Sequence, residues 1–468
     1  MSEEIIEESE MTPEAQTQEA QEATSESKSG KGRKKERKKL TPEQKKRRTV
    51  KALIITGAVV LALAIFISGI AIGNTVGTNA LIKQGQSMTA VEYTEHKQLV
   101  PTKSDDEWTY FTMDEDREFK VLQFTDVHIG GGSFSQQKDA WAMNAVATMI
   151  RKEQPDLVVI TGDIAYPVPF QAGTFNNLNA TRIFSQMMES LQVYWTFAFG
   201  NHDTEAYSMY SRREISEFYE SQNYKYCLYQ RGFADDDDKF GDIDRGFGNH
   251  IINVKNKEGN VIESLVIFDS HSYTDGDYFG IAWKYDNIHQ SQVDWYKEQM
   301  EEITRSNGAG AQPVKNLAFF HIPLVEYREA WKSLRDLNKD LAAGDVAYVD
   351  GKPVTYYYGV MGESEKESNG VQSYGIYCGF GTDELFEEGL THGLQGIFCG
   401  HDHYNNFSIN YNGIRLTYGM SIDYLAYPGI YKEHSQRGCT VITLSNDGAF
   451  NCTPRNYYKD YDVAHERG

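Results

Sequence analysis

The distribution of polar and apolar residues divides the chain into distinct parts. Residues 1–51 are polar and rich in charge, residues 52–82 contain no charged side chain, and from residue 118 short apolar runs alternate with amphipathic stretches. A charged segment with few aromatic residues cannot bury enough apolar surface to fold by itself. We therefore predict a disordered tail over 1–51, an apolar helix over 52–73, a polar stalk over 74–117 and a folded domain over 118–468.

The alternation after residue 118 indicates an α/β domain. Amphipathic periodicity predicts helices over 139–153, 177–191 and 290–305. Short apolar runs predict strands over 119–125, 156–161, 193–199, 264–269, 316–320, 396–399, 414–418 and 440–444. Strands that alternate with helices favour mixed sheets packed between helical layers.

The apolar segment 52–73 has the length and composition of a transmembrane helix. A basic cluster lies directly before it, at 45–48 and Lys51, and such clusters stay on the cytoplasmic side. A cleaved signal peptide is the alternative, but the leading segment is too long and the apolar run exceeds a usual signal core. We expect a single-pass anchor in the cell membrane, with a cytoplasmic N-terminus, an extracellular stalk and an extracellular domain.

The charge of the chain narrows the range of partners. The formal net charge of the whole chain is −21. The tail contains a basic cluster that offsets its acidic residues, so the acidic excess falls on the exported part. An acidic domain repels nucleic acid at long range. We expect no nucleic-acid partner, and we expect the lipid bilayer to be contacted through the single N-terminal helix.

Polar motifs follow several of the predicted strands. They are Asp126-Val127-His128, Gly162-Asp163, Gly200-Asn201-His202-Asp203 and Gly400-His401-Asp402-His403, with a separate His321. Taken alone, each motif is common, since Gly-Asp after a strand is usually a turn and a lone histidine is usually a core residue. In α/β folds, however, ligand sites gather at the carboxyl ends of strands, where all of these motifs fall. Their conjunction predicts one metal centre.

The residue types suit two metal ions that act on a phosphate ester. A metal pair about 3.5–4 Å apart generates a nucleophile from water and clamps the phosphoryl oxygens. Such a pair needs a shared carboxylate together with neutral nitrogen and amide ligands, because too many anions would repel the substrate. Two aspartates, one asparagine and four histidines provide that balance. The expected reaction is hydrolysis of a phosphate ester by in-line attack of a metal-bound hydroxide.

The motif series resembles the calcineurin-like metallophosphoesterase superfamily, which includes the purple acid phosphatases, over roughly residues 118–430. Three further features resemble the branch related to purple acid phosphatase 29-like proteins: the run 319–324 (FFHIPL), the turn 268–270 (FDS), and GHDH followed by Asn405 or Asn406. The resemblance implies a four-layer αββα sandwich of two mixed β-sheets flanked by helices, preceded here by the transmembrane helix.

The resemblance also implies roles for individual residues. The first metal would be held by Asp126, His128 and His403, the second by Asn201, His321 and His401, and Asp163 would bridge the two. His202 would protonate the leaving oxygen or stabilise the transition state. Asp203 would orient the His202 imidazole. The metals would be Mn, Fe or Zn, and their identity stays open.

One position departs from the purple acid phosphatase pattern. Those enzymes have a glycine where His128 stands and take a tyrosine ligand from a GDxxY motif, which the segment 162–166 matches here. His128 and Tyr166 cannot easily occupy one coordination position. We favour His128 as the ligand and Tyr166 as a pocket or packing residue.

Other segments bear on the substrate. The insertion 327–395 separates His321 from the last motif, and we expect it to reach the metal cleft and set specificity, as loops on rigid scaffolds do. Asp423, Tyr424 and Tyr427 are expected to line the same pocket. The acidic stretch 235–244 is either a calcium loop or a solvated loop, and its spacing favours the latter.

The predicted function is that of a membrane-anchored extracellular phosphoesterase acting on a phosphate monoester. The alternative enzyme is a phosphodiesterase acting on nucleotides, lipid headgroups or cell-envelope polymers. A non-catalytic anchored binding protein is the alternative from another class. That alternative predicts lost ligands, and the sequence has a residue for every ligand position.

Overall fold

The computed structural model describes residues 40–103, 108–113, 115–232, 246–274, 284–368, 370–381, 383–427, 429–430 and 436–463. The chain divides into two compact units, Met1–Phe66 and Ile67–Gly468. The acidic stretch 235–244 and residues 1–39 of the expected tail lie outside the described residues.

Helix α2 contains the predicted apolar segment but extends beyond both of its ends. It runs over Pro42–Gln86 and is long and apolar enough to cross a membrane. Residues 42–51, expected to belong to a disordered tail, form its first turns. The reason is local, since Thr41 and Gln44 each accept a hydrogen bond from the other's backbone N–H and Pro42 begins the helix.

The segment expected to be a stalk contacts the folded unit. The last turns of α2 bury Gly77, Thr78, Leu81 and Gly85. Strand β1 (Thr102–Lys103) pairs with β2 (Thr109–Thr112), which lies beside β6 (His250–Lys255) in parallel register. The boundary at residue 118 stays a prediction, and these contacts favour a folded unit that begins directly after the apolar segment.

Two mixed β-sheets form the centre of the folded unit. The smaller has the strand order β17-β16-β3-β4-β5, with β3, β4 and β5 parallel and β16 antiparallel to β3. Its strands are β3 (Phe119–Phe124), β4 (Leu157–Thr161), β5 (Trp195–Ala198), β16 (Gly438–Leu444) and β17 (Phe450–Asn456). The strand order of the larger is β1-β2-β6-β7-β8-β13-β15-β14-β10-β9. Its remaining strands are β7 (Val261–Ile267), β8 (Asn316–Phe319), β9 (Val346–Val349), β10 (Lys352–Tyr358), β13 (Leu394–Cys399), β14 (Ser408–Tyr411) and β15 (Ile414–Tyr418).

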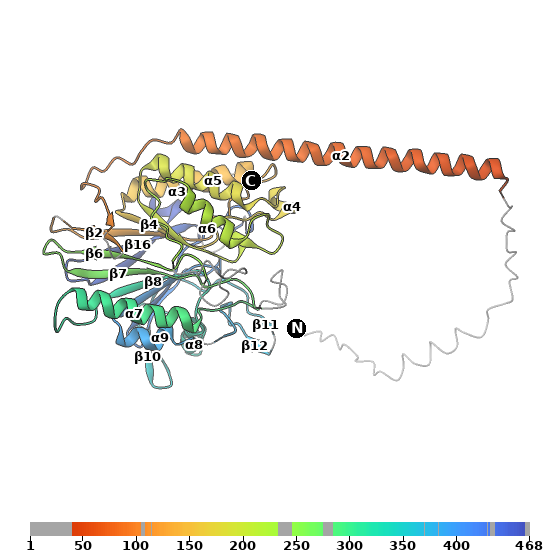
Figure 1. The fold of residues 1–468 in the computed structure, drawn as a ribbon. Coiled ribbons are helices and arrows are strands. Elements are labelled where there is room, and N and C mark those ends of the chain that lie inside the picture. Colours follow the sequence, from red (N-terminus) through yellow and green to blue (C-terminus); the bar gives the residue numbers. More distant parts are fainter. Residues whose placement is uncertain are drawn as a thin grey trace, which may run out of the picture. The chain divides into compact units, whose positions relative to one another are not determined.

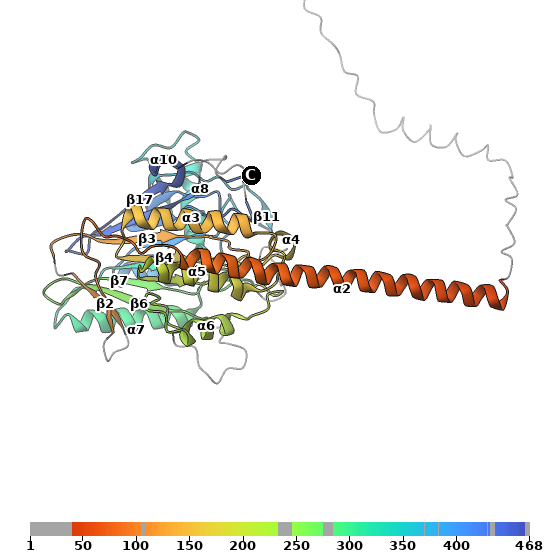
Figure 2. The same cartoon turned by 90° about the horizontal axis from the view of Figure 1, so that it is seen from above.

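Helices cover the outer faces of both sheets, which gives four layers (Figure 1). Seen from above, α3 (Gln136–Glu153) and α5 (Asn177–Leu191) run over β3 and β4 (Figure 2). The larger sheet carries α7 (Gln290–Ser306), α8 (Val325–Arg335) and α9 (Leu385–Thr391). The shorter elements are α4 (Pro169–Ala172), η1 (His202–Thr204), α6 (Arg212–Ser221), α10 (Tyr457–Asp460) and the small hairpin of β11 (Glu367–Ser368) and β12 (Val371–Gln372). The arrangement confirms the predicted αββα class.

The core explains why the layers stay together. One buried cluster joins α3 and α5 to the smaller sheet and continues to Phe319 and Phe398 of the larger sheet. A second cluster packs Tyr296 of α7 and Tyr327 of α8 against the outer face of the larger sheet. Each fully buried large apolar side chain contributes about 1.5–3 kcal/mol relative to its exposed state. The two sheets therefore form one rigid support for the loops at their strand ends.

Candidate metal centre

The predicted ligands come from both sheets. In the smaller sheet, Asp126 follows β3, Asp163 follows β4 and Asn201 follows β5. In the larger sheet, His321 follows β8 and His401 follows β13. The strands are parallel within each of these groups, so their carboxyl ends lie at the same edge of each sheet.

The backbone of these loops is unusual. Asp126, His128, Asp163 and His401 all have φ between 50° and 79°, in the left-handed region that non-glycine residues rarely adopt. Such conformations persist only where the surrounding structure enforces them, and they concentrate at functional sites. Asp203 provides part of that enforcement, as described below.

Four of the predicted ligands form a compact buried cluster. Ligand atoms of Asp126, His128, Asp163 and His403 all lie within 4.8 Å of one another. His403 Nε2 is 3.2 Å from Asp126 Oδ1, and His128 Nε2 is 3.3 Å from Asp163 Oδ2. Asp126 Oδ1 is buried, and apart from this close approach of His403 Nε2 it receives no hydrogen bond from the described residues. A buried carboxylate oxygen without a partner is costly unless a cation neutralises it, so this donor set fits a metal ion.

The remaining ligands gather around the same carboxylate. His321 Nε2 is 3.1 Å from Asp163 Oδ2 and 3.1 Å from Asn201 Oδ1. His321 Nδ1 donates to the Thr161 carbonyl at 2.8 Å, which leaves Nε2 for a metal. The His401 ring lies edge-on to His321, with 5.1 Å between centroids. Asp163 Oδ2 thus lies within 3.3 Å of a ring nitrogen of His128 and of one of His321.

Neighbouring charges shift the pKa values of the residues in this cluster. Burial alone would raise the pKa of Asp163, but the neighbouring His321 and His202 hold it well below its ordinary value. Burial alone would lower the pKa of His128 and His321, but adjacent carboxylates raise both to about 9. These shifts favour the protonated forms of His128 and His321 beside the buried carboxylates. A divalent or trivalent cation would replace those protons.

Asp423 holds two of the histidines, a role that sequence patterns did not indicate. Its Oδ1 is 3.3 Å from His128 Nδ1, and its Oδ2 is 3.0 Å from His403 Nδ1. Backbone N–H groups of Leu425, Ala426 and Tyr427 donate to the same carboxylate. Carboxylates that accept from the distal nitrogen of a metal-binding histidine fix the ring and its tautomer. Here one carboxylate serves both rings.

We expect Asp423→Asn to weaken metal binding about 10–100-fold, because an amide can accept from one imidazole N–H but its NH₂ group repels the other. Metal titration by equilibrium dialysis measures the effect, with the exposed Asp340→Asn as the matched control. Unchanged affinity in Asp423→Asn would contradict this role.

The contacts of His202 and Asp203 are not those that the sequence predicted. Asp203 does not orient His202; its carboxylate accepts from the backbone N–H groups of Asp163, Ala165 and Gly200 at 2.8–3.0 Å. Glu205 is the partner of His202, with Oε1 2.7 Å from Nδ1. His202 and Asp203 belong to the 3₁₀ turn η1, which Glu205 directly follows. Side chains three positions apart eclipse in such a turn, so residue 205 rather than 203 lies beside residue 202.

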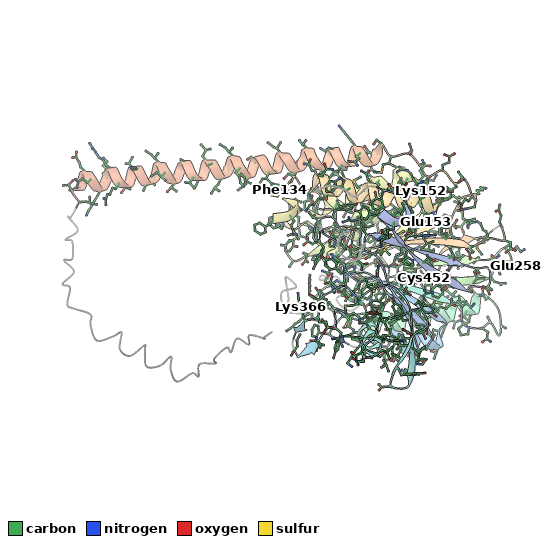
Figure 3. All side chains as sticks on the ribbon, turned by 180° about the vertical axis from the view of Figure 1, so that it is seen from behind. Phe134, Lys152, Glu153, Glu258, Lys366 and Cys452 are labelled. Carbon is green, nitrogen blue, oxygen red and sulfur yellow. The ribbon has the colours of Figure 1, made fainter. Side chains whose placement is uncertain are left out.

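Next to the predicted ligands is a cavity of ≈ 260 Å³. Tyr166 lies in its wall and stacks on His128, with 4.6 Å between ring centroids. The insertion 327–395 contributes Glu363, Lys366 and Tyr377, and Tyr427 contributes from the loop that also holds Asp423. Figure 3 labels Lys366 at this edge of the domain. A larger cavity, of ≈ 770 Å³, is lined by Trp108, Tyr219 and His250 among others, and none of its described lining residues is a predicted ligand.

Fold and site together define a metallophosphoesterase of the two-sheet class. Residues 119–405 match the model of the calcineurin-like phosphoesterase family, and the chain belongs to that family. Within it, the chain has the features of the purple acid phosphatase-like branch.

Three relatives in sequence support that assignment. The chain is 25% identical to "Probable inactive purple acid phosphatase 28" of Arabidopsis thaliana over 67% of its own length and 72% of that protein. It is 28% identical to "Probable inactive purple acid phosphatase 14" of the same plant, over 67% of this chain and 72% of the relative. For "Phosphatase DCR2" of Saccharomyces cerevisiae the identity is 27%, over 64% of this chain and 47% of the relative. A solved dimetal phosphatase from Danio rerio aligns at 12% identity and a TM-score of 0.42, over 72% of this chain and 96% of that one.

Proposed function

We propose that the chain hydrolyses a phosphate monoester at a dinuclear metal site. The observation that carries the proposal is the position of Asp163 Oδ2, 3.3 Å from His128 Nε2 and 3.1 Å from His321 Nε2. Asp126, His128 and His403 would hold one metal, Asn201, His321 and His401 the other, and Asp163 both. When bound, the metals would supply a nucleophile and neutralise the phosphoryl charge.

The protein's own residues would position the substrate and move the proton. His202 lines the cavity and keeps 27% of its side chain exposed, so it can meet a leaving group. Glu205 Oε1 lies 2.7 Å from His202 Nδ1, and this ion-pair contact would hold the ring so that Nε2 is the nitrogen that exchanges a proton. Tyr273 donates to Glu205 at 3.0 Å and ties that carboxylate in place.

The size of the cavity favours a monoester over a diester. Pockets for drug-sized ligands measure roughly 300–1,000 Å³, and the cavity here lies just below that range. It has room for a phosphoryl group and one small ester arm. Its tyrosines, Tyr166, Tyr273, Tyr285, Tyr377 and Tyr427, suit a planar or sugar-like arm.

Membrane anchoring and an extracellular site form part of the proposal. The support is α2, whose apolar part has a mean hydropathy of 2.7 over an 18-residue window, with the basic residues 45–48 before it. That charge placement favours a cytoplasmic N-terminus and an exported domain.

The test uses the full chain in detergent, since residues before 118 pack into the folded unit. Hydrolysis of p-nitrophenyl phosphate and of bis-p-nitrophenyl phosphate is compared with added Mn, Fe or Zn and after chelation. We expect metal-dependent turnover of the monoester, faster than that of the diester. Preference for the diester would identify a phosphodiesterase. Two bound metals without turnover of either ester would support a non-catalytic protein, in keeping with the names of the plant relatives.

A further inference from the structure

Exposed apolar side chains of the folded unit form a patch near Asn74 of α2. Its members are Phe134, Phe170, Phe175 and Met209, whose exposed fractions are 56%, 94%, 49% and 61%. We propose that this interfacial patch rests on the lipid bilayer and fixes the folded unit against the membrane surface. The inference rests on the membrane anchoring proposed above.

Backbone hydrogen bonds hold the segments that carry the patch together in pairs. Phe134 N–H donates to the Ala172 carbonyl at the end of α4, which carries Phe170. Met209 N–H donates to the Phe175 carbonyl at 2.9 Å. Figure 3 shows Phe134 at the edge of the domain. Contiguous exposed apolar groups on a folded unit mark contact with a partner or a membrane.

The end of the apolar helix is bonded directly to the patch. Asn74, the first residue after the predicted span, donates through Nδ2 to the Gly173 carbonyl at 2.9 Å and accepts from Ser133 N–H at 2.7 Å. Residues 52–73 measure about 33 Å as a helix, which matches the hydrocarbon thickness of about 30 Å. Asn74 therefore lies at the level of the headgroups, and the segments bonded to it lie at the same level.

The charge pattern of the patch also fits a lipid surface. The chain has a net charge of −21, yet the segments 129–137 and 164–181, which carry Phe134, Phe170 and Phe175, contain no charged residue. Acidic side chains would be repelled by anionic headgroups. Exposed phenylalanines instead favour burial at the boundary of headgroups and acyl chains. The segments begin just after His128 and Asp163, so docking would also steady the loops that hold these ligands.

The experiment places fluorescent probes on the full chain in liposomes of phosphatidylcholine and phosphatidylglycerol. Phe134→Cys and Phe170→Cys are labelled with an environment-sensitive dye, and quenching by spin-labelled lipid is measured. The native chain gives the background, because its cysteines are buried or partly buried. Ile65→Cys reports insertion of the helix, and Tyr348→Cys on β9, 67% exposed, is the matched surface control. Thermal unfolding of each variant checks that the fold is unchanged.

We expect the labels at 65, 134 and 170 to lose most of their fluorescence and the label at 348 to keep it. If the label at 65 is quenched while the labels at 134 and 170 behave like the label at 348, the docking surface is overturned and the membrane anchor is not. Absence of quenching at 65 would overturn the anchor, and with it this surface. Equal quenching at all four positions would indicate general adsorption and would also overturn the proposal.

Discussion

Replacing Asp163 by asparagine is expected to lower turnover of a phosphate monoester at least about 10³-fold and to reduce the bound metal below two ions per chain. The carboxylate lies between His128 and His321, so both metals would lose a shared anionic ligand. Metal pairs supply several kcal/mol of charge stabilisation in the transition state, and each 1.4 kcal/mol is a factor of ten in rate. Turnover and metal content are measured on the same sample.

The control distinguishes loss of the metals from loss of the fold. Asp163 also accepts from the His202 backbone N–H at 2.8 Å, and an asparagine oxygen preserves that hydrogen bond. Asp294→Asn, on the exposed face of α7, removes a carboxylate elsewhere. Full activity with two metals in Asp163→Asn would contradict the bridging role. A lowered unfolding temperature in the metal-free state would show that the fold, rather than coordination, had been damaged.

The ligand candidates could be found from the sequence because their positions follow from the strands. Asp126, Asp163, Asn201, His321 and His401 stand at the ends of apolar runs, and a sheet brings such ends together. The structure gathers all of them, and their assignment to two metals is what the Asp163 experiment tests. The left-handed backbone angles of Asp126, Asp163 and His401 had no signal in the residue types.

The partners of these residues could not be found in the same way. Asp423 contacts His128 and His403 from a loop nearly three hundred residues after His128, and no local pattern links them. Glu205 is the partner of His202 only because the chain forms a 3₁₀ turn there. Asp203 was the nearer carboxylate in sequence, but the turn directs it to the backbone of the neighbouring loop.

Some strands of the larger sheet could not be predicted from the sequence either. β10 lies in the insertion 327–395 and pairs with β14, and β9 completes the edge. The tyrosines of β10 gave no clear alternation by which a strand could be recognised. β2 is four residues long, in a stretch that was predicted as a stalk, and its pairing with β6 is non-local. Short strands at sheet edges depend on partners that the local sequence does not name.

The names of the plant relatives raise the question of whether this chain is catalytically active, and the catalytic test answers it. Those proteins are named as probable inactive phosphatases. In this chain, a candidate ligand occupies every position of both proposed metal sites, and His202 lines the cavity beside them. The role of His202 as a proton donor can therefore be tested by its substitution.

We expect His202→Ala to lower kcat about 10²–10⁴-fold for an alkyl phosphate, because the basic alkoxide must be protonated as it leaves. The loss should be much smaller for p-nitrophenyl phosphate, whose weakly basic leaving group departs without a proton. Metal content should stay unchanged, since His202 is not among the proposed ligands. Glu205→Gln should also lower kcat more for the alkyl phosphate than for p-nitrophenyl phosphate. The decrease should be smaller than in His202→Ala, because the imidazole remains and only its contact with residue 205 changes. Equal losses for both esters would assign His202 to positioning or charge stabilisation instead of proton transfer.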